Sequence, residues 1–334
     1  MLSLVEKLFS WLMTGFLAVF TIFFNMYLLL INYRSYRKKH KMNPADFIIT
    51  GLSMSSISQQ VLAYTWQTMD VIDAVCRLGT VEAVFLVLTF SFKFIIFWTT
   101  AFLIFYYGTK LVVEPVHCYT RIQEAIVKHV HTVLAVIFVS GLVNCVPLLS
   151  VLTYHNGTTD LGDCGSIMPS DVNGRIYVFY YVTISDIIPG IVMVKCSISI
   201  SYHLAKHLQD MKASTNGAHG PKLGTQMRVI KMTLCLVCVY LCFVAADIYT
   251  QMTVVLQRQN TLAFMVLFGS IYTAVSAFVL VYGKKSYWKE LIASYNLFLD
   301  EFPCLSKLKV DEASCPQPKT IDYLKTEGWV CKEF

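Results

Sequence analysis

Seven long apolar segments constrain this chain more than any other feature of its sequence. They run over about residues 11–32, 46–67, 83–109, 128–152, 177–203, 229–256 and 262–283. The hydrocarbon core of a bilayer is about 30 Å thick, so a helix needs roughly 20 apolar residues to cross it, and each segment is long enough. The alternation of polar and apolar residues that a membrane barrel requires is missing from them. The sequence therefore predicts an all-α membrane protein, a seven-transmembrane helix bundle.

The overall composition excludes a water-soluble globular protein. Of the 334 residues, 56% are hydrophobic and 14% are charged, whereas a soluble domain carries about 25% charged residues. So little polar surface cannot cover a globule in water. We therefore expect a multi-pass protein of the plasma membrane without a separate soluble domain.

Positive charge gathers on one side of the predicted bundle. The segment RSYRKKHK at 34–41 follows the first apolar run, and further Lys and Arg residues follow the fifth and seventh runs. The connections after the second and fourth runs carry Asp residues instead. Because Lys and Arg accumulate in cytoplasmic loops, the N-terminus is predicted outside and the C-terminus inside. The formal net charge of +6 thus reflects orientation, and we expect no nucleic-acid partner.

The segment after the seventh apolar run has helical periodicity. Tyr287, Leu291 and Tyr295 follow one another at intervals of four residues behind a pair of lysines, which is typical of an amphipathic helix lying along a membrane face. Residues 1–295 are therefore predicted to form the seven-helix bundle with this short inner helix at its end. Residues 296–334 mix charge, proline and cysteine and are predicted to form a cytoplasmic tail.

Two features are expected on the outer side. Asn156 begins an Asn-Gly-Thr triplet in the longest outer loop, which is an acceptor pattern for N-glycosylation. Cys76 and Cys164 are the two cysteines in predicted outer loops, where the oxidising environment permits disulfides. The sequence alone leaves open whether these two cysteines are bonded.

Polar residues form a stripe along the third apolar segment. Glu82, Thr89, Lys93 and Thr100 are separated by seven, four and seven positions, which places them on one face of a helix. An ionisable residue at bilayer depth is costly and usually faces the bundle interior, so each is a candidate functional residue. We therefore expect this stripe to point inward.

Three ionisable residues on three segments share one depth. With a rise of about 1.5 Å per residue, Lys93 lies roughly 15 Å below the outer end of its helix, and Asp186 and Asp247 each lie about 13 Å below theirs. Glu82 is too far along the helix to pair with Lys93, so Asp247 or Asp186 is the expected counter-ion. Two interpretations remain open: a buried salt bridge that holds three helices in register, and a ligand pocket in which these groups orient an otherwise apolar guest.

The sequence offers no catalytic arrangement. The eight histidines lie near the predicted loops, and none forms a metal-ligand set or a nucleophile–base pair with a residue in the middle of a span. We therefore expect neither an enzyme, nor a metal site, nor a cofactor.

Five stretches of the sequence match motifs of a known family. They are DFIITGL at 46–52, Trp98 with Tyr106, Tyr107 and Lys110, the set Leu204, His207 and Met211, residues 228–231, and Ser276 with Lys284 and Lys285. In order and spacing they resemble the taste receptors type 2, the bitter taste receptors, over about residues 15–295. The D-R-Y, C-W-x-P and N-P-x-x-Y motifs of rhodopsin-like receptors are missing. Ser56 stands where the family usually has arginine, which indicates a divergent member.

The resemblance implies a small-molecule site in the outer half of the bundle. The positions that would face a ligand, together with Asp186 from the depth argument, are Thr89, Lys93, Phe243, Asp247 and Met265. The family usually has a neutral polar residue in place of Lys93. A cation there would favour anionic or carbonyl-rich ligands unless Asp247 neutralises it.

The resemblance also implies signalling through a heterotrimeric G protein, gustducin-like, at the inner face. The residues expected near that partner are Tyr107, Lys110, His207 and Arg228. A pheromone receptor similar to the vomeronasal type 1 family is the alternative among receptors. A small-solute transporter or channel is the alternative from another class.

Overall fold

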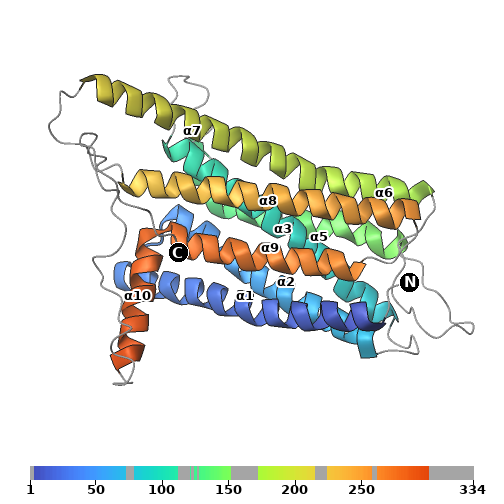
Figure 1. The fold of residues 1–334 in the computed structure, drawn as a ribbon. Helices are drawn as coiled ribbons and strands as arrows, with labels where there is room; N and C mark the ends of the chain where they lie inside the picture. Colours follow the sequence, from blue (N-terminus) through green and yellow to red (C-terminus); the bar gives the residue numbers. More distant parts are fainter. Residues whose placement is uncertain are drawn as a thin grey trace, which may run out of the picture.

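The computed structural model describes residues 4–72, 79–111, 121, 124–125, 128–151, 172–214, 224–257 and 262–300. Within these ranges every regular element is a helix (Figure 1). They are α1 (Leu4–Lys39), α2 (Pro44–Ile72), α3 (Gly79–Leu111), α5 (Val130–Val151), α6 (Val172–Val182), the π-helical turn η1 (Thr183–Ile187), α7 (Ile188–Ser214), α8 (Gly224–Gln257), α9 (Leu262–Gly283) and α10 (Lys285–Asp300). The long helices run side by side as one bundle, and α10 lies across one end of it (Figure 1).

Six helical segments are long and apolar enough to cross a membrane. They are Val5–Lys39, Val81–Lys110, Val130–Leu149, Val172–His203, Met227–Thr253 and Leu262–Gly283. Six of the seven predicted spans are therefore confirmed by length and composition. The second predicted span also forms a long helix, α2, but it does not meet the same apolar criterion.

The polar side chains of α2 explain this difference, because they are buried among neighbouring helices. Gln60 is fully buried and donates a hydrogen bond to Thr273 on α9 at 2.5 Å. Gln67 is likewise buried and donates to the Ala263 carbonyl oxygen at 3.2 Å. A buried amide is costly unless it is hydrogen-bonded. Helix α2 is therefore a polar internal element of the bundle, held between α1 and α3.

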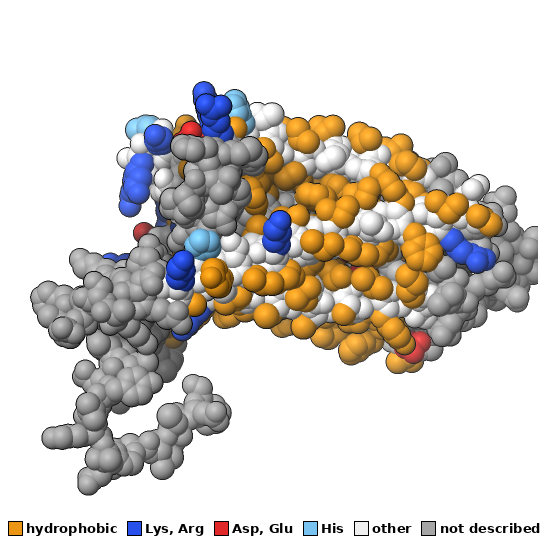
Figure 2. All heavy atoms as spheres, turned by 90° about the horizontal axis from the view of Figure 1, so that it is seen from above, with side chains coloured by type: hydrophobic (Ala, Val, Ile, Leu, Met, Phe, Trp, Pro, Cys, Tyr) orange, Lys and Arg blue, Asp and Glu red, His pale blue; other side chains and the backbone are white. Residues whose placement is uncertain are grey.

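Large apolar side chains cover the outside of the bundle. Phe9, Phe16 and Phe23 are spaced by seven residues along α1, and they are 57%, 67% and 62% exposed. Figure 2 shows the same character along the flank, with Lys and Arg gathered towards the end where α10 lies. Contiguous apolar surface on this scale marks an interaction surface, and α-helices are one of the two structures that can sit in lipid. The exposed face of α1 therefore suits contact with acyl chains.

A wide turn interrupts the rod formed by α6, η1 and α7. Pro189 lacks an N–H group, so a proline inside a helix removes one main-chain hydrogen bond. Just before it, the Ile188 N–H donates to the Thr183 carbonyl, five residues back, as in a π-helix. The Ile184 carbonyl then lacks both its α-helical and its π-helical main-chain donor. The Trp98 indole of α3 donates to this oxygen at 3.1 Å and so satisfies it.

A polar network fixes α10 to the end of the bundle. The Tyr287 hydroxyl donates to Asn32 at 2.7 Å, and the Tyr27 hydroxyl donates to the Tyr287 carbonyl at 2.8 Å. Lys284 forms an ion pair with Asp46 at the start of α2. Burial lowers the pKa of the Lys284 amine from its ordinary value, and the Asp46 carboxylate opposes that shift. Tyr287, Leu291 and Tyr295, the residues of the predicted amphipathic helix, lie in α10, which runs past residue 295 to Asp300.

We expect Gly141→Ala to destabilise the contact between α5 and α3. A Cβ atom at Gly141 would lie 2.6 Å from Ile95 Cγ1, and forcing extra volume into a packed core costs about 1–3 kcal/mol. The thermal unfolding midpoint of the detergent-solubilised protein measures this effect. Gly51→Ala is the matched control, because a Cβ there would meet Leu134 at an ordinary 3.7 Å. Equal midpoints for the two variants would contradict close packing at Gly141.

Candidate functional site

Lys93 of α3 lies in the interior of the bundle between two carboxylates from other helices. Its amine donates to Asp247 Oδ2 of α8 at 2.6 Å and lies 3.5 Å from Asp186 Oδ1 of η1. The Lys93 side chain is 8% exposed, and the two aspartate side chains are 1% exposed or less. Three separate helical elements therefore meet at one buried ionic cluster, defined here as Lys93, Asp186 and Asp247. The depth argument from sequence predicted this meeting.

Each carboxylate has one further side-chain donor. Ser185 donates to Asp186 Oδ1 at 2.8 Å, and Gln251 donates to Asp247 Oδ2 at 2.6 Å. The remaining oxygens, Asp186 Oδ2 and Asp247 Oδ1, are buried without a hydrogen-bond partner in the described part of the chain. One amine thus faces two carboxyl groups. The cluster retains acceptor capacity that a further donor could use.

Aromatic rings enclose the Lys93 amine. It lies 5.5 Å from the centre of the Phe97 ring and 5.6 Å from the centres of the Tyr181 and Phe243 rings. A cation within about 6 Å of a ring centre is attracted by the ring's quadrupole. The Tyr181 hydroxyl donates to the Phe90 carbonyl at 3.0 Å, so that ring is held in place. The surroundings therefore favour a cation as well as an apolar guest.

The cluster lies between two apolar regions of the interior. One region contains Phe90 and Tyr181, and the other contains Ile95, Phe97 and Met193. On α3, Lys93 falls between Phe90 of the first region and Ile95 of the second. Along the rod formed by α6, η1 and α7, Asp186 likewise falls between Tyr181 and Met193. A polar level thus divides the apolar core of the bundle into two parts.

The other predicted ligand residues are less closely joined to the cluster. Phe243 contacts the Lys93 amine through its ring, as described above. The Thr89 hydroxyl is buried and donates to the Phe85 carbonyl of its own helix at 2.8 Å. Met265 is buried in the region of Tyr181, whereas Phe243 belongs to the region of Phe97. The structure thus brings together Lys93, Asp186, Asp247 and Phe243, and it places Thr89 and Met265 in their surroundings.

The residues predicted near a G protein have different environments. Tyr107 is buried, whereas Lys110 is exposed at the end of α3. Arg228 donates from Nε to the Tyr282 carbonyl at 3.0 Å, and its guanidinium lies 5.3 Å from the centre of the Tyr282 ring. This contact ties the start of α8 to the end of α9. His207 lies within α7, but its side chain is outside the described set.

Both predicted outer features fall outside the described residues. These are the glycosylation acceptor Asn156 and the cysteine pair Cys76 and Cys164. Sequence reasoning also missed the donors to the carboxylates. Gln251 is one helical turn after Asp247, so the spacing of neighbours on a helix could have identified it. Ser185 is adjacent to Asp186 and points to the same carboxylate only because of the local π-helical turn.

We expect Lys93→Met to destabilise the protein strongly. It would leave two buried carboxylates without their shared cation, and removing one partner of a buried pair typically costs about 3–5 kcal/mol. The triple variant Lys93→Met/Asp186→Asn/Asp247→Asn should recover most of the lost stability, because no charge is then left buried. Thermal unfolding of the solubilised protein compares the three forms.

Lys195→Met provides the control for loss of a lysine within a membrane helix. Lys195 is exposed on α7, so we expect its replacement to have little effect. A triple variant no more stable than Lys93→Met would show that electrostatic coupling does not hold the cluster together.

Comparison with known proteins gives one family. The family model described as Taste receptor protein (TAS2R) matches residues 1–293. This range contains the described helices from α1 to α9 and residues 285–293 of α10. No curated protein sequence matches the chain.

Proposed function

The chain belongs to the taste receptor (TAS2R) family, and from that premise we propose that it is a G-protein-coupled receptor for small bitter molecules. The family is one of receptors and not of enzymes. The buried cluster of Lys93, Asp186 and Asp247 is the observation that carries the proposal within this chain. Charged residues inside a membrane bundle are costly and commonly mark a functional site.

We place the receptor in the plasma membrane with its N-terminus outside. Helix α1 ends with Arg37, Lys38 and Lys39, and α3 ends with Lys110 in its last turn. Lys284 and Lys285 lie at the same end of the bundle, beside α10. Because cytoplasmic loops are enriched in Lys and Arg, the α10 end is assigned to the cytoplasm. In this arrangement α2 also crosses the membrane, with Gln60 and Gln67 buried against its neighbours and Met54 and Val61 exposed on its outer side.

The charge balance of the cluster favours a cationic ligand. Asp247 already neutralises Lys93, so the amine is not free to attract an anion. Asp186 Oδ2 remains a buried acceptor in the described part of the chain, and the Lys93 amine next to Asp186 is surrounded by aromatic rings. A ligand ammonium would gain a charge-assisted hydrogen bond there and cation–π contacts with the rings. We therefore propose amines with an apolar body as the preferred ligand class.

Ligand binding would act on the fifth and sixth helices of the bundle. The Tyr240 hydroxyl donates to the Asp186 carbonyl, so α8 and η1 are joined directly below the cluster. A ligand that binds one arrangement of these helices more tightly shifts the population towards it. Movement of α8 would break the contact between Arg228 and Tyr282 and open the cytoplasmic end to a heterotrimeric G protein. The family resemblance implies that this partner is similar to gustducin.

The experiment compares the responses of the unmodified receptor and of single-residue variants to ligands of different charge. Cells expressing the receptor with a promiscuous G-protein α subunit are exposed to a panel of amine, neutral and carboxylate bitter compounds, and calcium release is recorded. We expect Asp186→Asn to raise the half-maximal concentration of amines by about 10-fold or more, since a hydrogen bond to a charged group contributes about 1.5–3 kcal/mol. Neutral compounds should change little.

Asp70→Asn is the control, because Asp70 pairs with Lys7 away from the cluster. Surface expression of every variant is measured by antibody labelling. Unchanged amine potencies in Asp186→Asn at normal surface expression would overturn the ligand assignment. A calcium response that persists in cells lacking the G protein would favour the channel interpretation instead.

A further inference from the structure

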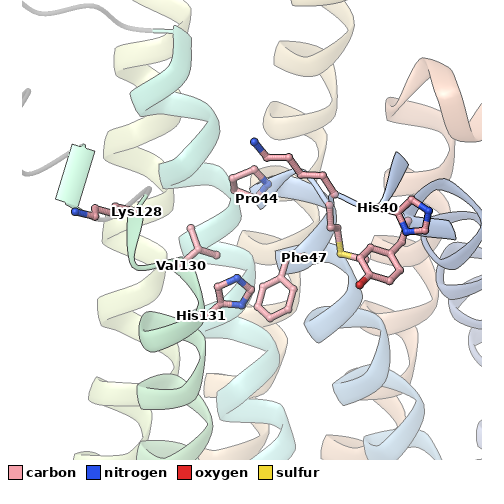
Figure 3. A pocket seen from close by; sticks show the side chains of 9 residues that line it. His40, Pro44, Phe47, Lys128, Val130 and His131 are labelled. Carbon is pink, nitrogen blue, oxygen red and sulfur yellow. The ribbon is translucent and has the colours of Figure 1, made fainter. Parts of the chain in front are cut away.

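A cavity lies far from the ionic cluster, at the basic end of the bundle. It is a cavity of about 440 Å³ between the end of α1, the start of α2 and the start of α5 (Figure 3). Four basic side chains contribute to its lining, and none of the lining residues is acidic. They are His40, Lys41, Lys128 and His131, which we call the basic pocket.

The backbone at the edge of this pocket is held in a strained conformation. Helix α1 ends at Lys39, and His40 follows with a φ of 49°. A residue other than glycine pays roughly 1–2 kcal/mol in this left-handed region. The His40 N–H still donates to the Tyr36 carbonyl at 2.8 Å, so the strain closes the helix and turns the chain towards α2. Residues held in such conformations often lie at binding sites.

Positive charge predominates in the lining of the pocket. The acidic residue nearest to it along the chain, Asp46, lies in the first turn of α2 but is engaged by Lys284 and by Asn43. The start of α2 adds the positive end of a helix dipole. The rings of Phe47 and His131 meet at 4.0 Å between their centres and close the floor between α2 and α5 (Figure 3). An anion of phosphate chemistry fits such surroundings.

The pocket opens where apolar surface gives way to basic residues. On α1, Tyr33 and Tyr36 are 61% and 47% exposed, and aromatic residues of this kind gather at the boundary between lipid and water. On α5, Phe138 is 43% exposed and lies about two helical turns after His131, on the flank that continues from the pocket. A molecule with a charged head and apolar chains could therefore occupy the pocket and this flank together.

We propose that the basic pocket binds the phosphorylated head group of an anionic phospholipid of the inner leaflet. This inference rests on the orientation proposed above, with the α10 end in the cytoplasm. Basic pockets between membrane helices on that side are suited to phosphoinositide head groups. The cavity volume lies within the range of small-ligand pockets, about 300–1,000 Å³. The acyl chains would lie along the exposed side of α5 at Phe138.

The test measures lipid binding to the full-length, detergent-solubilised receptor by native mass spectrometry. The probes are dioctanoyl phosphatidylinositol bisphosphate, dioctanoyl phosphatidylcholine and soluble inositol trisphosphate. We expect the phosphoinositide to bind well above the other two. In Lys41→Gln/Lys128→Gln its affinity should fall by about 30-fold, since two basic residues near a charged lipid are removed. Both lysines are exposed, so the fold should be kept.

Lys206→Gln/Lys285→Gln is the matched control. It removes the same charge from exposed positions of α7 and α10 that do not line the pocket, and its affinity should change less than two-fold. Lys41→Arg/Lys128→Arg should keep the affinity of the unmodified receptor. Equal losses in the two glutamine variants would overturn the proposal in favour of general charge attraction. Equal binding of inositol trisphosphate and the phosphoinositide would overturn the lipid assignment and give the pocket to a soluble phosphate.

Discussion

The buried ammonium of Lys93 is the interaction on which the arrangement of this bundle depends. It is held by carboxylates from η1 and α8, so three elements must keep their relative depth for the charges to remain compensated. In a medium of low dielectric constant, a shift of one helix would leave a charge unpaired at high cost. The apolar regions on either side of Lys93 can adapt to sliding more easily, since hydrophobic contacts are not directional. The ionic level therefore sets the register of the bundle.

The composition of the Lys93, Asp186 and Asp247 cluster bears on whether it is a structural salt bridge, a recognition site or both. A bridge that only holds helices together needs one cation and one anion, with every remaining lone pair satisfied. Here the second carboxylate is supplied by η1, and one oxygen of each aspartate is buried without a partner in the described residues. Such an excess is unfavourable unless another donor uses it. The structural and the binding interpretations are therefore compatible, and the same three residues can serve both.

Much of the architecture could be predicted because membrane helices follow simple rules of length and periodicity. The apolar runs and the depth of Lys93, Asp186 and Asp247 required only the rise of an α-helix. The contact between Asp46 and Lys284 could not be predicted, because it joins residues 238 positions apart and no local pattern reports it. The polar character of α2 also weakened its signal, since the amide nitrogens of Gln60 and Gln67 donate to residues of α9 that are far away in the sequence. The basic pocket depends on the left-handed turn at His40, for which the sequence carries no glycine as a marker.

Pro189 lies in the rod formed by α6, η1 and α7, and it gives η1 two alternative registers of main-chain hydrogen bonds. In the observed register the Ile188 N–H reaches Thr183, and the carbonyl left over is that of Ile184, which Trp98 satisfies. In regular α-helical bonding Ile188 would reach Ile184, and the carbonyl left over would be that of Ser185, since Pro189 has no N–H. A switch from one register to the other would rotate α7 by about 100° about its axis and shift it by about 1.5 Å along that axis relative to α6. The Trp98 indole on α3 therefore stabilises the observed register, two residues from the Asp186 that we propose as the ligand acceptor.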